Sequence, residues 1–191
     1  MKMERKANHR ERKNIRLKEY DYSQPGEYFV TICTKDREHR FGRIVKGRMS
    51  MNDHGTVVES CWKEIPKHYQ NIGLDEFTVM PDHFHGIVMI LEKSIVGATH
   101  ASPRQGKRNR LGDVVGSFKS AATKRMNETS GTPGVSVWQR GYYDHIIRDE
   151  QSLDRIRDYI IDNPRRWSAD GNNADATIED ECDRLMNPST N

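Results

Sequence analysis

The chain has 191 residues, of which 34% are hydrophobic and 31% are charged, so it fits one domain with solvated extensions. The three cysteines (Cys33, Cys61 and Cys182) form no CxxC pair, and no apolar run is long enough to cross a bilayer. We therefore expect no disulfide framework and no membrane partner, and a reducing cytoplasm fits best. The net charge is +3, but six acidic residues against one arginine give residues 170–191 a charge of −5, which leaves +8 on residues 1–169. A basic domain favours nucleic acid as its partner.

The charge pattern divides the chain into three predicted parts. Residues 1–20 are an arm rich in lysine and arginine, which either orders on DNA or only solubilises the chain. Residues 21–168 are predicted to form the folded domain. Residues 169–191 contain few apolar residues and are predicted to be a disordered acidic tail.

The first half of the domain alternates strand and helix patterns. β-Branched and aromatic residues predict a strand at Tyr28–Thr34, and looser alternation predicts a strand or hairpin at Phe41–Met51. Apolar residues near helical spacing predict a helix over Val57–Tyr69, which Pro66 ends or kinks. Two further strands are predicted, at Leu74–Met80 and His83–Leu91.

The second half begins with a predicted mobile basic loop over Lys93–Arg110. A helix at Leu111–Met126 and strand character over Val135–Arg148 follow. The last predicted helix is Gln151–Asn163, with Asp149 as its N-cap and Pro164 as its stop, and Trp167 packs back onto the domain.

Neighbouring strands with few crossover helices indicate an α+β fold rather than a doubly wound sheet. The simplest arrangement is one antiparallel sheet with helices packed on one face.

Two histidines in Asp82-His83-Phe84-His85-Gly86 are candidate metal ligands. Alternate side chains of a strand share a face, so His83 and His85 project together while Phe84 points the opposite way. Two imidazoles at this spacing can bind one cation. The competing interpretation is a pair of structural histidines, and a histidine-triad hydrolase is disfavoured because Ile87 occupies the next alternate position.

Tyr159 is the candidate nucleophile. On a helix it lies on the same face as Asn163, one turn later, and Arg155, one turn earlier. If this face covers the histidines, Asn163 either binds the metal or binds a phosphate. A phenol has a pKa near ~10 in solution, so it needs a metal, a base or a cation to attack near neutral pH. The alternative is a half-buried structural tyrosine.

His145 is a third candidate ligand, on a strand expected beside the histidine pair, although an exposed strand histidine is equally plausible. Tyr142 and Tyr143 are rival nucleophiles. Only Tyr159 has an amide on the same helix face, so it ranks above them.

These motifs occur in the order found in one known family. The chain resembles the REP-associated tyrosine transposases, which belong to the IS200-like single-tyrosine HUH transposases. The resemblance spans roughly residues 10–168 and depends on four segments: residues 15–34, residues 80–85, residues 138–148 and residues 156–164.

The resemblance implies a ferredoxin-like or RRM-like HUH fold with the site on its sheet. It implies a single-stranded DNA endonuclease and strand transferase that acts on REP-like hairpins, with His83 and His85 as the HUH motif, Mg²⁺ or Mn²⁺ as cofactor, and Tyr159 forming a 5′-phosphotyrosine. Asn163 stands where relatives often carry a glutamine ligand, so the third ligand is Asn163 or His145. Relatives act as monomers or homodimers.

Basic residues in the arm, in the loop and on the helices are expected to bind the DNA backbone, although each is also explained by solvation. The candidates are Arg12, Lys13, Arg16, Arg104, Lys107, Arg108, Arg110, Lys119 and Arg155.

Two other functions compete with strand transfer. One is a domesticated protein that binds hairpin DNA without turnover, and the other is a metal-dependent hydrolase unrelated to DNA. The intact set of His83, His85 and Tyr159 favours the enzyme, since a binding module needs none of the three.

Overall fold

The computed structural model describes residues 20–92 and 109–169 of the chain. The elements in chain order are β1 (Gly26–Cys33), the short 3-10 turn η1 (Lys35–Arg37), β2 (Gly42–Val45), β3 (Arg48–Met51), α1 (Asp53–Lys63), α2 (Ile65–His68), β4 (Ile72–Val79), β5 (His83–Ile90), α3 (Leu111–Ser130), β6 (Tyr143–Ile147) and α4 (Glu150–Ala169).

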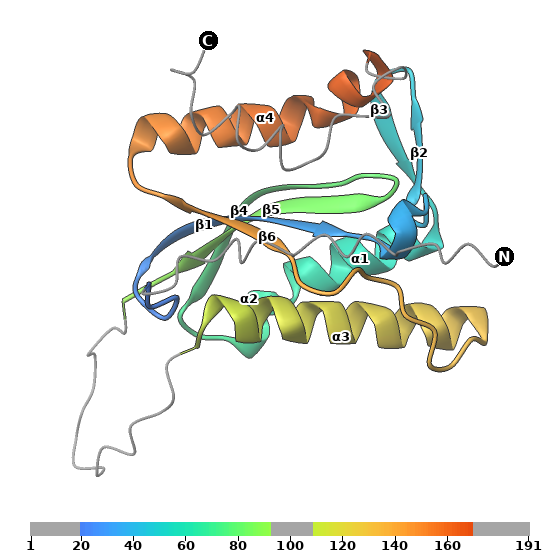
Figure 1. Ribbon diagram of the computed structural model, residues 1–191, viewed down its shortest axis with the longest axis horizontal. Helices are drawn as coiled ribbons and strands as arrows, with labels where there is room; N and C mark the ends of the chain where they lie inside the picture. Colours follow the sequence, from blue (N-terminus) through green and yellow to red (C-terminus); the bar gives the residue numbers. More distant parts are fainter. Residues whose placement is uncertain (1–19, 93–108, 170–191) are drawn as a thin grey trace, which may run out of the picture.

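Four strands form one antiparallel sheet in the order β4-β5-β1-β6, so the first strand of the chain lies at its centre. Strands β2 and β3 form a separate hairpin beside the end of α4 (Figure 1). Each of the two helical crossovers, through α1 and through α3, returns the chain to the opposite half of the sheet, as in a ferredoxin-like fold. The predicted α+β class with helices packed on an antiparallel sheet is confirmed.

The prediction that the helices share one face is wrong. Helices α1 and α3 cover one face of the sheet, and α4 covers the other (Figure 1). Side chains alternate along β1, so that Tyr28 and Val30 pack in the core with α1 and α3, whereas Phe29 packs with Ile87 in the cluster under α4. Since β1 and β5 carry buried side chains on both faces, each face has a helical cover.

The core under α1 and α3 is centred on three aromatic rings. The Trp62 ring centroid lies 4.5 Å from that of Phe84 and 5.1 Å from that of Phe118, and all three side chains are buried. Gly86 makes this packing possible, because a Cβ there would lie 2.5 Å from Cζ2 of Trp62 and 2.9 Å from Cε1 of Phe84.

Helix α1 begins earlier than its apolar pattern predicts and breaks sooner. The side chain of Asn52 caps it by accepting a hydrogen bond from the Gly55 amide at 3.0 Å. The helix stops at Lys63, and Pro66 lies in the first turn of the separate α2, so the predicted interruption is confirmed. The strand expected over residues 135–148 is reduced to β6, preceded by a single bridge between Thr34 and Trp138.

Helix α4 is capped as predicted but does not end at its proline. Asp149 Oδ1 accepts a hydrogen bond from the Ser152 amide at 2.7 Å. Pro164 lies inside the helix, which continues to Ala169. The extension carries Trp167 against the rings of His39 and His83, at 5.8 Å and 5.5 Å between centroids, as expected of a tryptophan that packs back. These contacts stabilise the last turns despite the missing proline N–H.

Cys33 and Cys61 are buried free thiols, as expected from their spacing, and Cys182 lies outside the described residues. Among the helices described, none has the length and apolar character that crossing a membrane requires.

The close packing at Gly86 gives a first prediction. Gly86→Ala should lower the free energy of unfolding by about 1–3 kcal/mol, because the added methyl displaces buried rings. Gly116→Ala is the matched control: it lies in α3 with nothing within 4 Å of an added Cβ, so it should raise stability by about 1 kcal/mol. Urea unfolding measures both changes, and equal stabilities for the two variants would contradict the packing described.

Candidate active site

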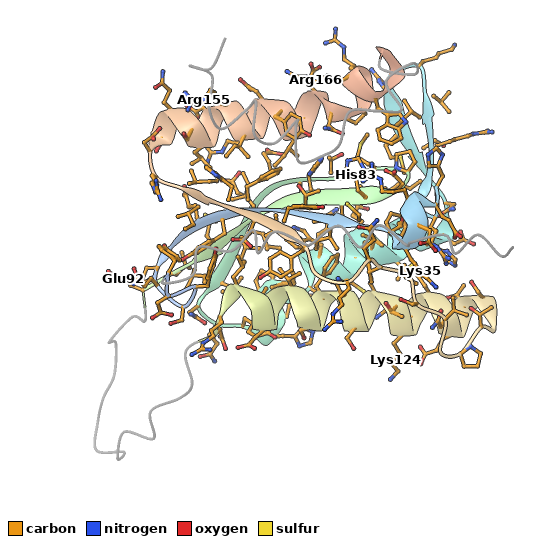
Figure 2. All side chains as sticks on the ribbon, viewed as in Figure 1. Lys35, His83, Glu92, Lys124, Arg155 and Arg166 are labelled. Carbon is orange, nitrogen blue, oxygen red and sulfur yellow. The ribbon has the colours of Figure 1, made fainter. Side chains whose placement is uncertain are left out.

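The two histidines of β5 lie side by side on the face of the sheet covered by α4. In the register with β1, His83 pairs with Cys33 and His85 with Thr31. The ring centroids are 4.5 Å apart, and both side chains are buried. Figure 2 shows His83 between the sheet and α4. Phe84 packs in the core on the opposite face. The shared face predicted for the two imidazoles is confirmed.

Hydrogen bonds at Nδ1 fix the orientation of both rings. Thr31 Oγ1 lies 2.8 Å from Nδ1 of His85, and Asp82 Oδ1 lies 2.7 Å from Nδ1 of His83. Since these bonds engage Nδ1, Nε2 is the atom through which each ring can bind a cation. A partner at Nδ1 that fixes ring orientation is typical of metal-binding histidines.

Arg37 holds the carboxylate that orients His83. Its Nε lies 2.9 Å from Asp82 Oδ2, and its Nη1 donates to Cys33 Sγ at 3.2 Å. Arg37 and the preceding Asp36 have φ values of 56° and 55°, in the left-handed region that non-glycine residues rarely adopt. Such strained backbone persists only where surrounding contacts hold it, and here it brings a positive charge beside the histidine pair.

Burial favours the neutral form of His85. It lowers the pKa of His85 well below the ordinary value, and the adjacent His83 and Arg37 act in the same direction. A neutral imidazole is the form that binds a cation.

Tyr159 faces this pair from α4. Its hydroxyl lies 3.4 Å from Nε2 of His85, and the two ring centroids are 5.2 Å apart. Phe29 stacks on His85 at 5.3 Å, and the Arg166 guanidinium lies 5.7 Å from the centre of the Tyr159 ring. This helix face therefore lies over the histidine pair, and the Tyr159 hydroxyl reaches the nitrogen of His85 that is expected to bind metal.

The two candidate third ligands differ in position. Asn163 is buried one turn after Tyr159 on the same helix. His145 pairs with Phe29, so it shares the sheet face of His85 but lies in the next row of the register. Its pKa is lowered by burial and then by the charge of Arg148. Within residues 20–92 and 109–169, no group of three or more His, Cys, Asp or Glu side chains is arranged to hold a metal ion. The choice between Asn163 and His145 as third ligand stays a prediction.

The predicted DNA-binding residues lie in different parts of the molecule. Arg155 is half-buried one turn before Tyr159, and its Nη2 donates to Ser152 Oγ at 2.8 Å. Arg110 is exposed at the start of α3. Six others lie outside the described residues: Arg12, Lys13, Arg16, Arg104, Lys107 and Arg108.

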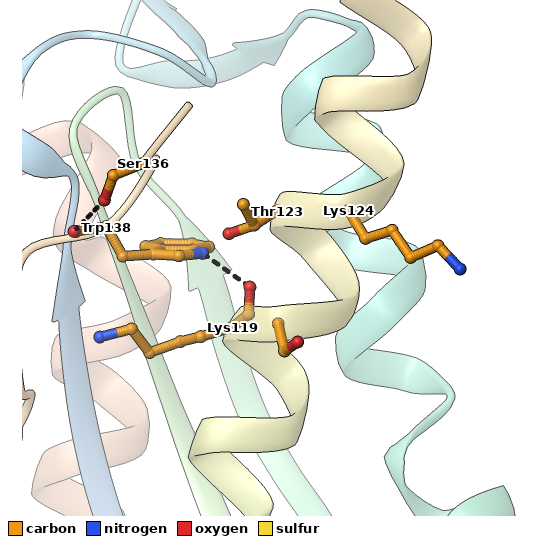
Figure 3. A pocket seen from close by; sticks show the side chains of 6 residues that line it. Lys119, Thr123, Lys124, Ser136 and Trp138 are labelled. Carbon is orange, nitrogen blue, oxygen red and sulfur yellow. Dashed lines mark hydrogen bonds between the residues drawn. The ribbon is translucent and has the colours of Figure 1, made fainter. Parts of the chain in front are cut away.

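Lys119 has a structural role in this fold. Its ammonium donates to the carbonyl oxygens of Gln139 at 2.8 Å and Gly141 at 2.7 Å, and these bonds hold the segment that leads into β6. It lines a hollow of about 430 Å³ beside Trp138 (Figure 3). Trp138 packs in the core under α3, on the sheet face opposite Tyr159. The structure does not bring Lys119 to the histidine pair.

Three residues of the site escaped sequence reasoning. Thr31 and Arg37 contact the site only through the register of β1 and the turn after it, which no local pattern reveals. Asp82 directly precedes His83, and a carboxylate next to a candidate metal ligand was the one signal in the sequence that could have identified it.

No protein-family model matches the chain. Two proteins of Haemophilus influenzae are similar to it. One, named only as an uncharacterized protein, is 40% identical over 167 residues, which cover 83% of this chain and 91% of that one. The other, named "Putative REP-associated tyrosine transposase", is 25% identical over 147 residues, or 75% of this chain and 73% of that one.

A solved structure of a REP-associated tyrosine transposase bound to a REP hairpin has the same fold. Its TM-score is 0.51 with 16% sequence identity, over 80% of this chain and 73% of that one. The chain thus has the fold of a tyrosine transposase, with a histidine pair and a tyrosine at one buried site. It belongs to the same family as the Haemophilus protein of 40% identity, and the resemblance to REP-associated tyrosine transposases that the motifs predicted is confirmed.

An ion pair joins α4 to the edge strand β4. The register of β4 shifts between Leu74 and Phe77, and Asp75 lies in this bulge. Arg157 donates to both Asp75 oxygens, with Nη2 2.6 Å from Oδ2. The hydrogen bond from Arg157 lowers the pKa of Asp75. Since Arg157 and Tyr159 are two residues apart, this pair helps to fix the tyrosine over the sheet.

The ion pair between Arg157 and Asp75 should stabilise the fold to a degree that depends on pH. A carboxyl whose pKa is lowered by folding stabilises the fold above its unfolded pKa, and this stabilisation is lost as the pH falls through its folded pKa. Asp75→Asn should therefore cost about 1–3 kcal/mol near neutral pH. The difference from wild type should vanish in acid below the usual carboxyl range.

The matched control is Asp154→Asn. Asp154 is exposed and accepts from the same Arg157 guanidinium at 3.0 Å, so its loss should cost less than about 1 kcal/mol. Urea unfolding over a pH series measures both variants. Equal costs at neutral pH, or a cost of Asp75→Asn that persists in acid, would show that the ion pair does not dock α4.

Proposed function

We propose that the chain is a metal-dependent endonuclease and strand transferase for single-stranded hairpin DNA, acting as a transposase does through a covalent 5′-phosphotyrosine. One observation carries the proposal: the Tyr159 hydroxyl lies 3.4 Å from Nε2 of His85, beside His83. The names of the relatives support it, since one is a REP-associated tyrosine transposase and a neighbour in fold is bound to a REP hairpin.

The donor set fits a divalent cation such as Mg²⁺ or Mn²⁺. His83 and His85 would bind it through Nε2, and the Asn163 amide would complete the set, with His145 as the alternative. Two neutral imidazoles and one amide form a weak site, so the scissile phosphate supplies part of the binding. When bound, the cation withdraws charge from that phosphate.

The chain's own residues account for the rest of the reaction. The Tyr159 oxygen bonds to phosphorus and loses its proton, while the bond from phosphorus to the 3′ oxygen breaks and that oxygen gains a proton. The new phosphotyrosine stores the energy of the broken bond, so rejoining needs no nucleotide cofactor. One chain supplies both histidines and the tyrosine, and this favours a site complete in a monomer, although a homodimer remains an alternative.

A second function has one observation in its favour. Tyr159, His83 and His85 are all nearly fully buried, so a phosphate reaches the hydroxyl only if the covering segments shift. A protein that binds hairpin DNA without turnover would need no such movement.

Replacing the nucleophile separates these functions. With Tyr159→Phe, the covalent protein–DNA adduct formed on a labelled single-stranded hairpin in Mg²⁺ or Mn²⁺ should disappear, because the phenol oxygen is absent. Hairpin binding should persist. Tyr142→Phe is the control and should retain the adduct, since Tyr142 packs against the core on the opposite face of the sheet.

Denaturing gels of the adduct and fluorescence anisotropy of the hairpin measure the two activities. Wild-type binding without any adduct, across a panel of hairpins, would favour the binding protein. Cleavage that survives Tyr159→Phe would indicate a hydrolase that uses water instead.

A further inference from the structure

The hairpin β2–β3 has one face that residues 20–92 and 109–169 leave exposed. In its register Arg43 pairs with Ser50 and Val45 with Arg48, so these four side chains share a face. All four residues are exposed, and Val45 keeps 43% of its surface accessible. Lys46, at the turn, is exposed as well. The opposite face carries Ile44 and Met49, which are partly buried.

The charge of this hairpin has one sign. Residues 42–51 contain Arg43, Lys46 and Arg48 and no acidic residue. In the part of the chain that the structure describes, none of the three forms an ion pair. Arg43 and Arg48 are diagonal neighbours across the strand pair. Residue positions in this relation are about 7–8 Å apart, so the two guanidinium groups repel each other unless an anion binds between them.

The hairpin extends the site formed by α4 and β5. Gly47 at its tip lies against α4, where an added Cβ would be 3.2 Å from Cγ of Arg165. Arg165 and Arg166 add two positive charges there, and both share Asp162 at 3.4 Å. Figure 1 shows the hairpin rising beside the end of α4.

The base of the hairpin is also linked to the histidines. The Trp167 ring contacts His39, which precedes β2, and contacts His83 on its other side. A chain of ring contacts therefore links the base of the hairpin to the candidate active site.

We propose that the face formed by Arg43, Val45, Arg48 and Ser50 binds the phosphate backbone of the single-stranded segment that leads to the scissile phosphate. The proposal rests on the proposed function, in which the substrate is hairpin DNA. The two guanidinium groups bind phosphates, the Ser50 hydroxyl donates a hydrogen bond, and Val45 offers apolar contact to a sugar. Phosphate contacts of this kind set the register of the strand and carry no sequence information.

The test is the binding of a fluorescein-labelled DNA hairpin with a single-stranded extension to the full chain over a range of salt concentrations. Arg43→Gln/Arg48→Gln should weaken binding roughly tenfold at low salt. It should also reduce the slope of log K against log salt by about 1–2, since two phosphate contacts are lost. The same hairpin without its extension should bind both proteins with similar affinity.

Lys63→Gln/Lys67→Gln is the matched control, because it removes the same charge from α1 and α2 on the other side of the sheet. It should lower the affinity and reduce the slope less than Arg43→Gln/Arg48→Gln does. Thermal unfolding should be unchanged in both double variants, since the replaced side chains are exposed.

Equal losses in the two double variants would overturn the proposal and indicate a general effect of net charge. Loss of affinity that does not depend on the extension would overturn it also, as would a wild-type chain that binds no hairpin at low salt. Binding that follows the prediction without any covalent adduct would leave this surface in place and contradict only the strand-transfer chemistry.

Discussion

The alternation of side chains along the two central strands is the constraint on which the rest of the structure depends. On β5, Phe84 and Val88 enter the core under α1 and α3, whereas His83 and His85 enter the layer under α4. Because both sets of side chains belong to one strand, the packing of Phe84 and Val88 in the core also fixes where the two imidazoles lie and in which direction they point. The large aromatic core therefore supports the site directly, and the site needs no long loops to position it.

Polar contacts then orient the side chains of the site on this sheet. Asp82 and Thr31 fix the rings of His83 and His85 through Nδ1, and Arg37 holds Asp82 from a strained turn. Burial keeps His85 neutral, and the positive charges that lie nearby come from Arg37 and Arg166. A buried histidine pair with cations around it suits a divalent metal that binds together with an anionic phosphate, because the metal and the phosphate each compensate the charge of the other.

Prediction from the sequence succeeded where the spacing of side chains along the chain follows the repeat of one helix or one strand. The shared face of His83 and His85, the helix that carries Tyr159, and the cap at Asp149 all follow from such periods. Prediction failed where tertiary contacts determine the structure. Helix α4 continues through Pro164 because residues beyond the proline pack on the sheet side. The same helix covers a face of the sheet that the prediction left without a helix. Thr31 and Arg37 were missed because only the register of β1 and the turn after it bring them to the histidines.

The central claim is that Tyr159 is the residue that becomes joined to DNA. The most direct measurement is mass spectrometry of tryptic peptides from the wild-type protein after incubation with a single-stranded hairpin and Mn²⁺ or Mg²⁺. Tyr159 and the rival tyrosines fall in separate peptides, residues 158–165 and residues 141–148. The account predicts a nucleotide on residues 158–165. A nucleotide on residues 141–148 would contradict it and make Tyr142 or Tyr143 the nucleophile.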